Sequence, residues 1–358
     1  MLHAVVMAGG SGTRFWPQSR KAMPKQLLRL AGDQTMIQQT VGRCDGWIQP
    51  ANTWVVTNQI QAEETSRQLP DVPKSNILIE PCGRNTAPCI GLAAVQILKQ
   101  DRNGLMFVMP ADHVIGPQGL FQQAGRTAEQ LVAQDPGRFV LFGVPPTFPS
   151  TSYGYIERHS PIEVVDGKAY SVASFREKPV RNVAEQYMDD GSYYWNCGIF
   201  CWKAEEILSA LCEYEPNIHM RLMTLADVIG TSAFDRTLAD EFPQMDSISI
   251  DYAVLERSDS VAVVEAPFEW DDVGSWLALP RLLGADDHNN TIDGDFCGVD
   301  SSGCIVRSAD GHVVATLGVE NLIIVHTPDA TLVANRDDAD SIRKLVDALR
   351  DAGHEALL

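Results

Sequence analysis

The first 26 residues constrain the fold of this chain more than any other stretch. An apolar, β-branched run at residues 4–8 leads directly into a glycine-rich segment at residues 9–12. Such a run predicts a buried first strand of an α/β sheet. Glycines after the strand let backbone N–H groups approach a ligand closely, because no Cβ stands in the way, and such groups bind phosphate. Arg14 and Lys25 add two positive charges, so the sequence predicts a phosphate-binding loop.

Two well-known phosphate loops fit this segment poorly. A Walker A loop requires Gly-Lys-Ser or Gly-Lys-Thr, and the chain contains neither tripeptide. A dinucleotide fingerprint requires Gly-x-Gly-x-x-Gly, but Phe15 stands where the third glycine would follow Gly10 and Gly12. A glycine-rich turn without a ligand is the simplest alternative. A turn without a ligand would not need the positive charges of Arg14 and Lys25, so we favour a phosphate-binding site of another kind.

Strand and helix signals alternate through the first 150 residues. Short apolar runs at residues 54–57, 77–79, 105–109 and 139–142 predict strands. Asn85 predicts the cap of a helix that has Pro88 in its first turn. This alternation indicates a Rossmann-like, doubly wound sheet of mostly parallel or mixed strands. Ligands of such sheets lie beyond the carboxyl ends of the strands, so residues 9–14, residues 80–86 and Asp112 are expected to share one crevice.

The overall charge excludes several classes of partner. The formal net charge is −19 and the sequence pI is about 4.7, which argues against binding to nucleic acid or an anionic membrane. No apolar run approaches the roughly 18 residues of a membrane span, and the N-terminus does not resemble a signal peptide. Eight scattered cysteines without a Cys-x-x-Cys pair predict reduced thiols, a cytoplasmic location and no zinc site.

The second half of the chain divides near residue 285. Residues 150–276 combine short strands with one helical stretch near 203–213. From about residue 289, β-branched runs separated by Gly, Asp and Asn predict an all-β appendage. An amphipathic helix starting near Asp337 ends the chain. We therefore expect a main domain over 1–284 and an appendage over 285–358. The terminal helix either pairs two subunits into a homodimer or packs on its own domain.

Ordered motifs over residues 4–276 resemble the sugar-1-phosphate nucleotidylyltransferases. Within that family they are most similar to the mannose-1-phosphate guanylyltransferases, a subgroup favoured by the Trp-Pro and Pro-Lys-Gln details. The motifs are Gly9-Gly10-Ser11-Gly12-Thr13-Arg14-Phe15-Trp16-Pro17, Pro24-Lys25-Gln26, Glu80-Pro81-Cys82-Gly83-Arg84-Asn85-Thr86-Ala87-Pro88, Pro110-Ala111-Asp112-His113, Tyr153-Gly154-Tyr155-Ile156, Glu177-Lys178-Pro179, Trp195-Asn196-Cys197-Gly198-Ile199-Phe200, Ser249-Ile250-Asp251-Tyr252-Ala253 and Trp270-Asp271-Asp272-Val273-Gly274-Ser275-Trp276.

The resemblance implies transfer of GMP from GTP to mannose 1-phosphate, which gives GDP-mannose and pyrophosphate. The same chemistry on another base or sugar is the nearest alternative, because contacts to the base are poorly visible in sequence. A non-catalytic subunit that senses nucleotide sugars is a further alternative. Such a subunit should lack the Arg14/Lys25 pair or a metal carboxylate, and this chain has all of them. Some relatives carry a fused isomerase domain; we expect a single activity here. The family often carries a short left-handed β-helix at the C-terminal end, and the repeat in this sequence is too irregular to establish one.

The resemblance also assigns candidate site residues. The catalytic candidates are Arg14, Lys25 and Asp112, and Asp112 and Asp272 are expected to hold Mg²⁺. The nucleotide half, about residues 1–150, would bind through Gly9, Gly10, Ser11, Gly12, Thr13, Arg14, Arg84, Asn85, Thr86 and Asp112. The sugar half, about residues 151–284, would bind through Gly154, Glu177, Lys178 and Asn196. His113 is expected to support its neighbours, because the reaction needs no proton shuttle, and Trp195 is expected to pack.

Overall fold

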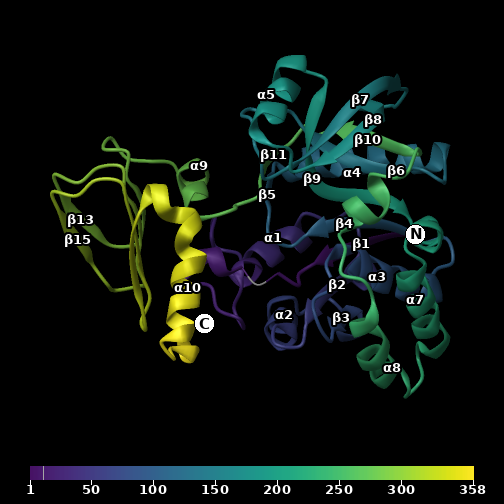
Figure 1. Ribbon diagram of the computed structural model, residues 1–358, viewed down its shortest axis with the longest axis horizontal. Helices are drawn as coiled ribbons and strands as arrows, with labels where there is room; N and C mark the ends of the chain where they lie inside the picture. The colour runs from purple at the N-terminus through teal and green to yellow at the C-terminus, as the bar shows by residue number, and fades with distance from the viewer. Residues whose placement is uncertain (11) are drawn as a thin grey trace.

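The computed structural model describes residues 1–10 and 12–358 of the chain. Figure 1 shows a larger α/β body and a smaller β-rich part beside it. Helix α10 (Ile342–Asp351) lies between the outermost strands of the β-rich part and the body. None of the helices in the described ranges is long and apolar enough to cross a membrane.

A mixed sheet forms the centre of the body, which confirms the predicted fold class. Its strands follow the order β3-β2-β1-β4-β9-β6-β10-β8-β7. The first four strands in that order are parallel, whereas β9 runs antiparallel between β4 and β6. The bounds are β1 (Leu2–Met7), β2 (Thr53–Asn58), β3 (Ile77–Glu80), β4 (Leu105–Pro110), β6 (Phe139–Val144), β7 (Gly154–Ile162), β8 (Ala169–Glu177), β9 (Tyr193–Lys203) and β10 (Val261–Glu265).

Helices cover both faces of this sheet. One apolar core joins the sheet to α3, α6 and α7, and a second core joins its other face to α1 and α4. Asn85 caps α3 as predicted, because its side chain accepts a hydrogen bond from the N–H of Thr86. The bounds are α1 (Met36–Gly42), α2 (Ala62–Gln68), α3 (Thr86–Gln100), α4 (Gln118–Gln134), α5 (Arg181–Asp190), α6 (Ala204–Tyr214), α7 (Pro216–Val228), α8 (Phe234–Glu241) and α9 (Leu279–Leu283).

The prediction of a single helical stretch between residues 150 and 276 is wrong. That region also contains α5, α7 and α8, and β9 spans 11 residues. The signal for α7 was present in the sequence. Pro216 stands in its first turn, and Ile218, Leu222 and Leu225 recur at helical spacing and are buried.

The β-rich part winds in short coils. Strands β12, β14 and β16 pair in parallel on one side, β13 and β15 pair in parallel on another, and β17 returns antiparallel to β16. A separate antiparallel ribbon of β5 and β11 connects to the site described below. The bounds are β5 (Val114–Gly116), β11 (Glu269–Asp271), β12 (Thr291–Asp293), β13 (Phe296–Val299), β14 (Ile305–Arg307), β15 (Val314–Leu317), β16 (Leu322–His326) and β17 (Thr331–Asn335).

The terminal helix begins later than predicted. Residues 336–341 form a 3₁₀ segment, and α10 starts at Ile342 rather than near Asp337. The Asn335 side chain accepts from the N–H of Asp337 and so caps the 3₁₀ segment instead. The apolar face of α10 packs within its own chain, where Ile342 and Val346 are buried. The core that covers this face contains residues of both the β-rich part and the body.

Candidate active site

The glycine-rich loop after β1 packs directly against the backbone of Lys25. Gly12 has a φ of +56°, and a Cβ on it would lie 2.4 Å from the backbone nitrogen of Lys25, so only glycine fits. The Gln26 side chain donates to the carbonyls of Ala8 and Gly10, at 2.7 and 3.1 Å. The N–H groups of Gly9 and Gly10 make no hydrogen bond to another described residue. They remain available to an anion. Ser11, which the prediction also placed in this loop, lies outside the described residues.

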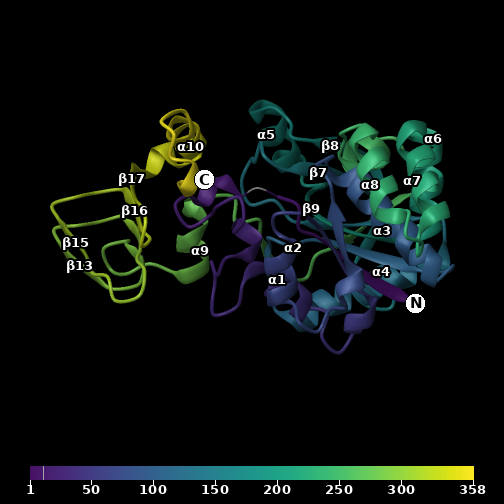
Figure 2. The same ribbon diagram turned by 90° about the horizontal axis from the view of Figure 1, so that it is seen from below.

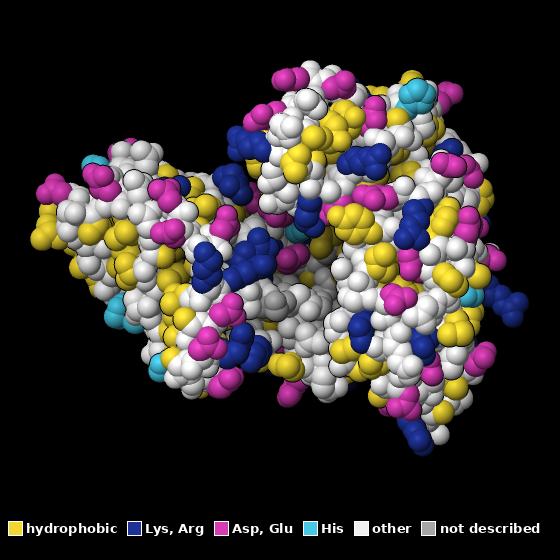
Figure 3. All heavy atoms as spheres, viewed as in Figure 1, with side chains coloured by type: hydrophobic (Ala, Val, Ile, Leu, Met, Phe, Trp, Pro, Cys, Tyr) yellow, Lys and Arg dark blue, Asp and Glu magenta, His cyan; other side chains and the backbone are white. Residues whose placement is uncertain are grey.

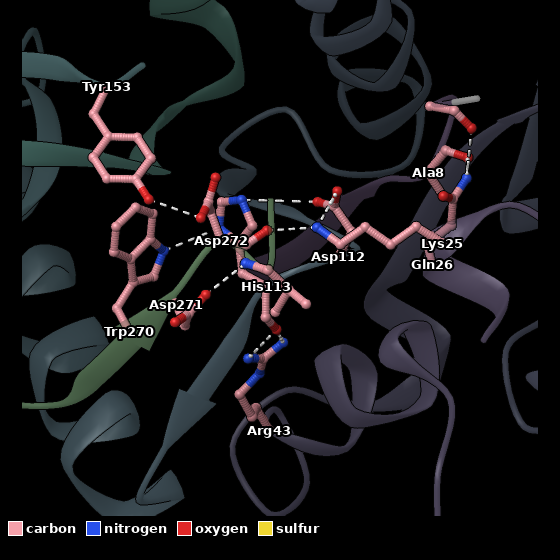
Figure 4. A network of polar contacts seen from close by, with 12 residues as sticks. Ala8, Lys25, Gln26, Arg43, Asp112, His113, Tyr153, Trp270, Asp271 and Asp272 are labelled. Carbon is pink, nitrogen blue, oxygen red and sulfur yellow. Dashed lines mark hydrogen bonds and ion pairs between the residues drawn. The ribbon is translucent and has the colours of Figure 1, made fainter. Parts of the chain in front are cut away.

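Lys25 joins the two predicted metal carboxylate positions (Figure 4). Its side chain is almost fully buried, and its Nζ donates to Asp112 Oδ2 at 2.9 Å and to the Asp272 carbonyl at 2.5 Å. Burial raises the pKa of the Asp112 carboxyl, but the positive charges of Lys25 and Arg14 outweigh that effect and hold the pKa below its usual range. Asp112 is therefore ionised at neutral pH.

Asp272 is held in place by its neighbours. The Tyr153 hydroxyl donates to Asp272 Oδ1 at 2.8 Å. The adjacent Asp271 plays a different part: it accepts from the N–H of Val273 and from the guanidinium of Arg281, and so fixes the turn. A Cβ on Gly274 would lie 3.6 Å from Arg14 Nη1, which places the Arg14 side chain beside this turn. The structure thus brings Arg14, Lys25, Asp112 and Asp272 together.

His113 is held by contacts with two neighbouring side chains. Trp270 Nε1 donates to His113 Nδ1 at 3.1 Å, and Arg43 donates to the His113 carbonyl. Burial lowers the pKa of the His113 imidazole to about 4, despite the charge of Asp112. The ring is therefore neutral at pH 7, and the supporting role expected for His113 stays a prediction.

The two carboxylates fit a divalent cation. Asp112 Oδ1 and Asp272 Oδ2 accept no hydrogen bond within residues 1–10 and 12–358, although His113 Nε2 lies 3.8 Å from Asp112 Oδ1. The second oxygen of each carboxylate accepts from Lys25 or Tyr153. The same ranges contain no group of three or more His, Cys, Asp or Glu side chains that could hold a metal. Mg²⁺ needs only one or two carboxylates, because phosphate oxygens and water complete its six ligands.

The predicted nucleotide loop after β3 is engaged with a distant segment. Arg84 donates to the Pro243 carbonyl. The Thr86 hydroxyl accepts from the N–H of Ile250 at 2.8 Å, and the N–H of Ala87 donates to the Ile248 carbonyl. These contacts connect the end of β3 to residues 243–250, and contact of Arg84, Asn85 and Thr86 with a nucleotide stays a prediction.

The four predicted sugar-side residues form one cluster. Gly154 on β7 stands opposite Glu177 on β8, and a Cβ on Gly154 would lie 2.4 Å from Glu177 Oε2. Lys178 Nζ pairs with Glu177 Oε1 at 2.7 Å. Asn196 on β9 lies beside Gly154. Because Tyr153 precedes Gly154 and binds Asp272, this cluster adjoins the phosphate side of the site.

Asp251 also belongs to this cluster, although its sequence motif predicted no role for it. Asn196 Nδ2 donates to Asp251 Oδ1 at 2.9 Å, and the N–H of Gly198 donates to Asn196 Oδ1 at 3.0 Å, so the orientation of the amide is fixed. Asp251 starts a π-helical turn, a feature that is frequent at functional sites. The Ser249-Ile250-Asp251 motif was the available signal, but only its position in space connects it to the sugar cluster.

Asp251 predicts a distinct pH dependence of stability. Burial, followed by the charge of Glu177, raises its pKa to about 7. The folded chain therefore holds a proton that the unfolded chain releases above pH 4 or so, and stability is lost as the pH rises towards 7. We expect the free energy of unfolding to fall less between pH 5 and pH 7 in Asp251→Asn than in the wild type, measured by urea unfolding. Parallel pH profiles for the two proteins would contradict this.

Figure 3 shows a hollow between the β-rich part and the body, with Lys and Arg side chains gathered at its edge. In a chain of net charge −19, such a local group of cations is what an anionic substrate requires. A separate cavity of about 690 Å³ lies beside β3 and α8, and its lining includes none of the predicted site residues.

Comparison with known proteins places this chain in a family. Residues 3–286 match the model of the nucleotidyl transferases, and residues 294–349 match that of the MannoseP isomerase/GMP-like beta-helix domain. The chain belongs to the nucleotidyl transferase family.

Several relatives carry a more specific description. A mannose-1-phosphate guanylyltransferase of Klebsiella pneumoniae is 40% identical over 353 residues, which is 98% of this chain and 74% of the relative. The alginate biosynthesis protein AlgA of Pseudomonas syringae pv. tomato is 36% identical, over 98% of this chain and 72% of the relative. A crystal structure from Thermus thermophilus described as a mannose-1-phosphate geranyltransferase has a TM-score of 0.85 and 35% identity, over 98% and 99% of the two chains.

Proposed function

We propose that this chain transfers GMP from GTP to mannose 1-phosphate, giving GDP-mannose and pyrophosphate. The observation that carries the proposal is the convergence of Arg14 and Lys25 with the carboxylates of Asp112 and Asp272 at one point beyond β1 and β4. Relatives at 36–40% identity that are described as guanylyltransferases support the choice of GTP and mannose 1-phosphate.

The chemistry needs charge neutralisation and alignment. An oxygen of the sugar phosphate attacks the α-phosphorus, and the bond between this phosphorus and the β-phosphate oxygen breaks, so pyrophosphate leaves. Both reactants are anions, and catalysis therefore depends on cations and positioning. Arg14 grips phosphate through its planar guanidinium, while Lys25 acts as a point charge. The N–H groups of Gly9 and Gly10 add neutral donors to the same phosphates.

A divalent cation, held by Asp112 and Asp272, would neutralise charge on the triphosphate. Lys25 holds both of these residues through its contacts with Asp112 Oδ2 and the Asp272 carbonyl. No side chain is needed as a general base, because the attacking phosphate is already an anion. The neutral His113 fits this scheme.

The sugar cluster supplies acceptors and one cation. Glu177 accepts hydrogen bonds from sugar hydroxyls, and Asn196 has one N–H left after its contact with Asp251. Lys178 is close enough to Glu177 to be held by it and faces the sugar phosphate in this scheme. Asp251 and Glu177 together place two carboxyl groups beside the sugar in this scheme.

Replacing Glu177 by glutamine should affect the sugar substrate selectively. The amide keeps the shape of the side chain but is a weaker acceptor and loses the pairing with Lys178. We expect KM for mannose 1-phosphate to rise about tenfold, as for the loss of one hydrogen bond to a charged group, with KM for GTP within about twofold. Glu185→Gln on the exposed face of α5 is the control. A change confined to the GTP constant would refute the assignment of Glu177 to the sugar.

Product analysis tests the proposed function directly. The protein is incubated with GTP, mannose 1-phosphate and Mg²⁺, and the nucleotide product is identified by mass spectrometry. GDP-mannose formed together with stoichiometric pyrophosphate is the expected result. Absence of any nucleotide sugar with these substrates would refute the proposal.

The remaining sequence expectations stay predictions. One is the division of the chain into a catalytic domain over 1–284 and an appendage over 285–358. Another is the division of the catalytic domain into nucleotide and sugar halves. A homodimer formed through the C-terminal region is a third. All eight cysteines carry free thiols, which supports a reducing, cytoplasmic location.

A further inference from the structure

An aromatic cluster lies directly behind the phosphate site. Phe15 and Trp276 contact edge to face with ring centroids 5.0 Å apart, and Trp276 Nε1 donates to the Trp16 carbonyl at 3.2 Å. All three side chains are at least 95% buried. Arg14 immediately precedes Phe15, and Asp272 lies four residues before Trp276. The cluster therefore joins the segment that carries the phosphate-binding arginine to the segment that carries a metal carboxylate.

The C-terminal part of the chain closes this cluster from the other side. Trp16 Nε1 donates to the Leu357 carbonyl at 2.9 Å. Ile342 and Val346 of α10 belong to the same apolar core as Phe15 and Trp276, as do buried residues of β14, β16 and β17. Nearby, the Arg20 guanidinium binds both oxygens of Asp329, at 3.0 and 3.1 Å. Figure 2 shows the chain's C-terminus beside the N-terminal segment that follows β1.

We propose that the C-terminal β-rich part and α10 position the phosphate site, with Trp16 and Trp276 as the positioning residues. This inference rests on the proposed nucleotidyl transfer and goes beyond it. Arg14 lies in a single 3₁₀ turn, Thr13–Phe15, and the turn at residues 271–274 is equally short. Asp272 directly follows β11 and accepts from Tyr153 and Lys25 on its open side. On their buried side both segments rest on the same apolar core, which contains Phe15, Trp16, Val273 and Trp276. The packing of this core therefore contributes to where Arg14 and Asp272 stand. A shift of about 1 Å at such groups is enough to slow the chemistry.

The β-rich part has a second apolar core that provides a matched control. Cys304, Val306, Val314 and Ile324 pack together, and this core contains no residue of the body. Ile323 and Ile324 are neighbours on β16, yet they belong to different cores because side chains of a strand alternate between its faces. One isoleucine and one valine can therefore be truncated in either core, with the same atoms removed.

The test compares two double variants of the full chain. Ile342→Ala with Val346→Ala loosens the core behind the phosphate site, and Ile324→Ala with Val306→Ala loosens the distant core. We expect kcat/KM for GTP to fall at least tenfold in the first variant and to stay within twofold of the wild type in the second, although both unfold at lower urea. KM for mannose 1-phosphate should stay within twofold in both, because the sugar cluster does not touch either core.

A milder variant keeps the proposal testable if the first pair does not fold. Trp16→Phe removes the indole N–H that reaches Leu357 and part of the buried ring, but keeps an aromatic side chain in the core. We expect at least a threefold fall in kcat/KM for GTP without loss of folded protein. Equal kinetic constants in all variants and the wild type would overturn the proposal, and so would equal losses in the two double variants.

If the wild type itself formed no nucleotide sugar, the proposed function would fail instead. The positioning would then be read from binding of Mg·GTP by tryptophan fluorescence, where unchanged affinity in the first variant would overturn it.

Discussion

Replacing Lys25 by alanine is expected to lower kcat/KM at least tenfold, and more if both of its contacts matter. The ammonium group is buried and bonded to Asp112 and to the Asp272 carbonyl, so its loss removes a cation from the phosphates and leaves the charge of Asp112 uncompensated. A charge-assisted hydrogen bond contributes about 1.5–3 kcal/mol when partly desolvated, which corresponds to roughly 10- to 150-fold in rate. Steady-state kinetics of pyrophosphate release measures this loss.

Lys25→Arg is the informative companion variant. It keeps the positive charge but cannot reproduce a compact ammonium between two oxygens, so we expect only partial recovery. Urea unfolding of each variant establishes that the protein is folded. Kinetics close to the wild type in folded Lys25→Ala would remove Lys25 from the phosphate site.

Asp272→Asn is expected to lower kcat by two or more orders of magnitude in a folded protein. The amide keeps the hydrogen bond from Tyr153 but withdraws a negative charge from the cation, and Mg²⁺ prefers carboxylate oxygens. The apparent affinity for Mg²⁺ should fall as well, which a titration of the rate with Mg²⁺ would reveal. The wild type should have no activity in excess chelator.

Glu269→Gln is the matched control for this substitution. Glu269 lies exposed on β11, three residues before Asp272. Its substitution by glutamine removes the same charge from the same segment, but outside the site. We expect its rate and Mg²⁺ dependence to match those of the wild type. If Asp272→Asn retained both properties too, Asp272 could not be a metal carboxylate.

Local signals in the sequence predicted the elements that surround the phosphate site. The apolar run before Gly9 predicted β1, and Asn85 with Pro88 predicted the start of α3, because strand burial and helix capping depend on neighbouring residues. The position of Gly12 over Lys25 could be understood only from the structure, although both residues were selected from the motif. The antiparallel insertion of β9 between β4 and β6 depends on long-range pairing and left no local signal.

The contacts that hold the site were harder to predict than its members. Tyr153, Trp270 and Asp251 stood in recognised motifs, but each acts on a residue far away in the chain: Asp272, His113 and Asn196, respectively. The C-terminal part was expected to be an appendage. Its packing against Trp16 and Trp276 arises from buried apolar surface shared between remote segments, which residue patterns do not encode.

A panel of four nucleoside triphosphates against several sugar 1-phosphates tests the central claim most directly. Pyrophosphate release is measured for every pair with the wild type in Mg²⁺, and kcat/KM is compared across the panel. The account predicts that GTP with mannose 1-phosphate gives the highest value, and that Lys25→Ala and Asp272→Asn lower it. A higher value for another pair would contradict the assignment of substrates, and no release with any pair would contradict nucleotidyl transfer itself.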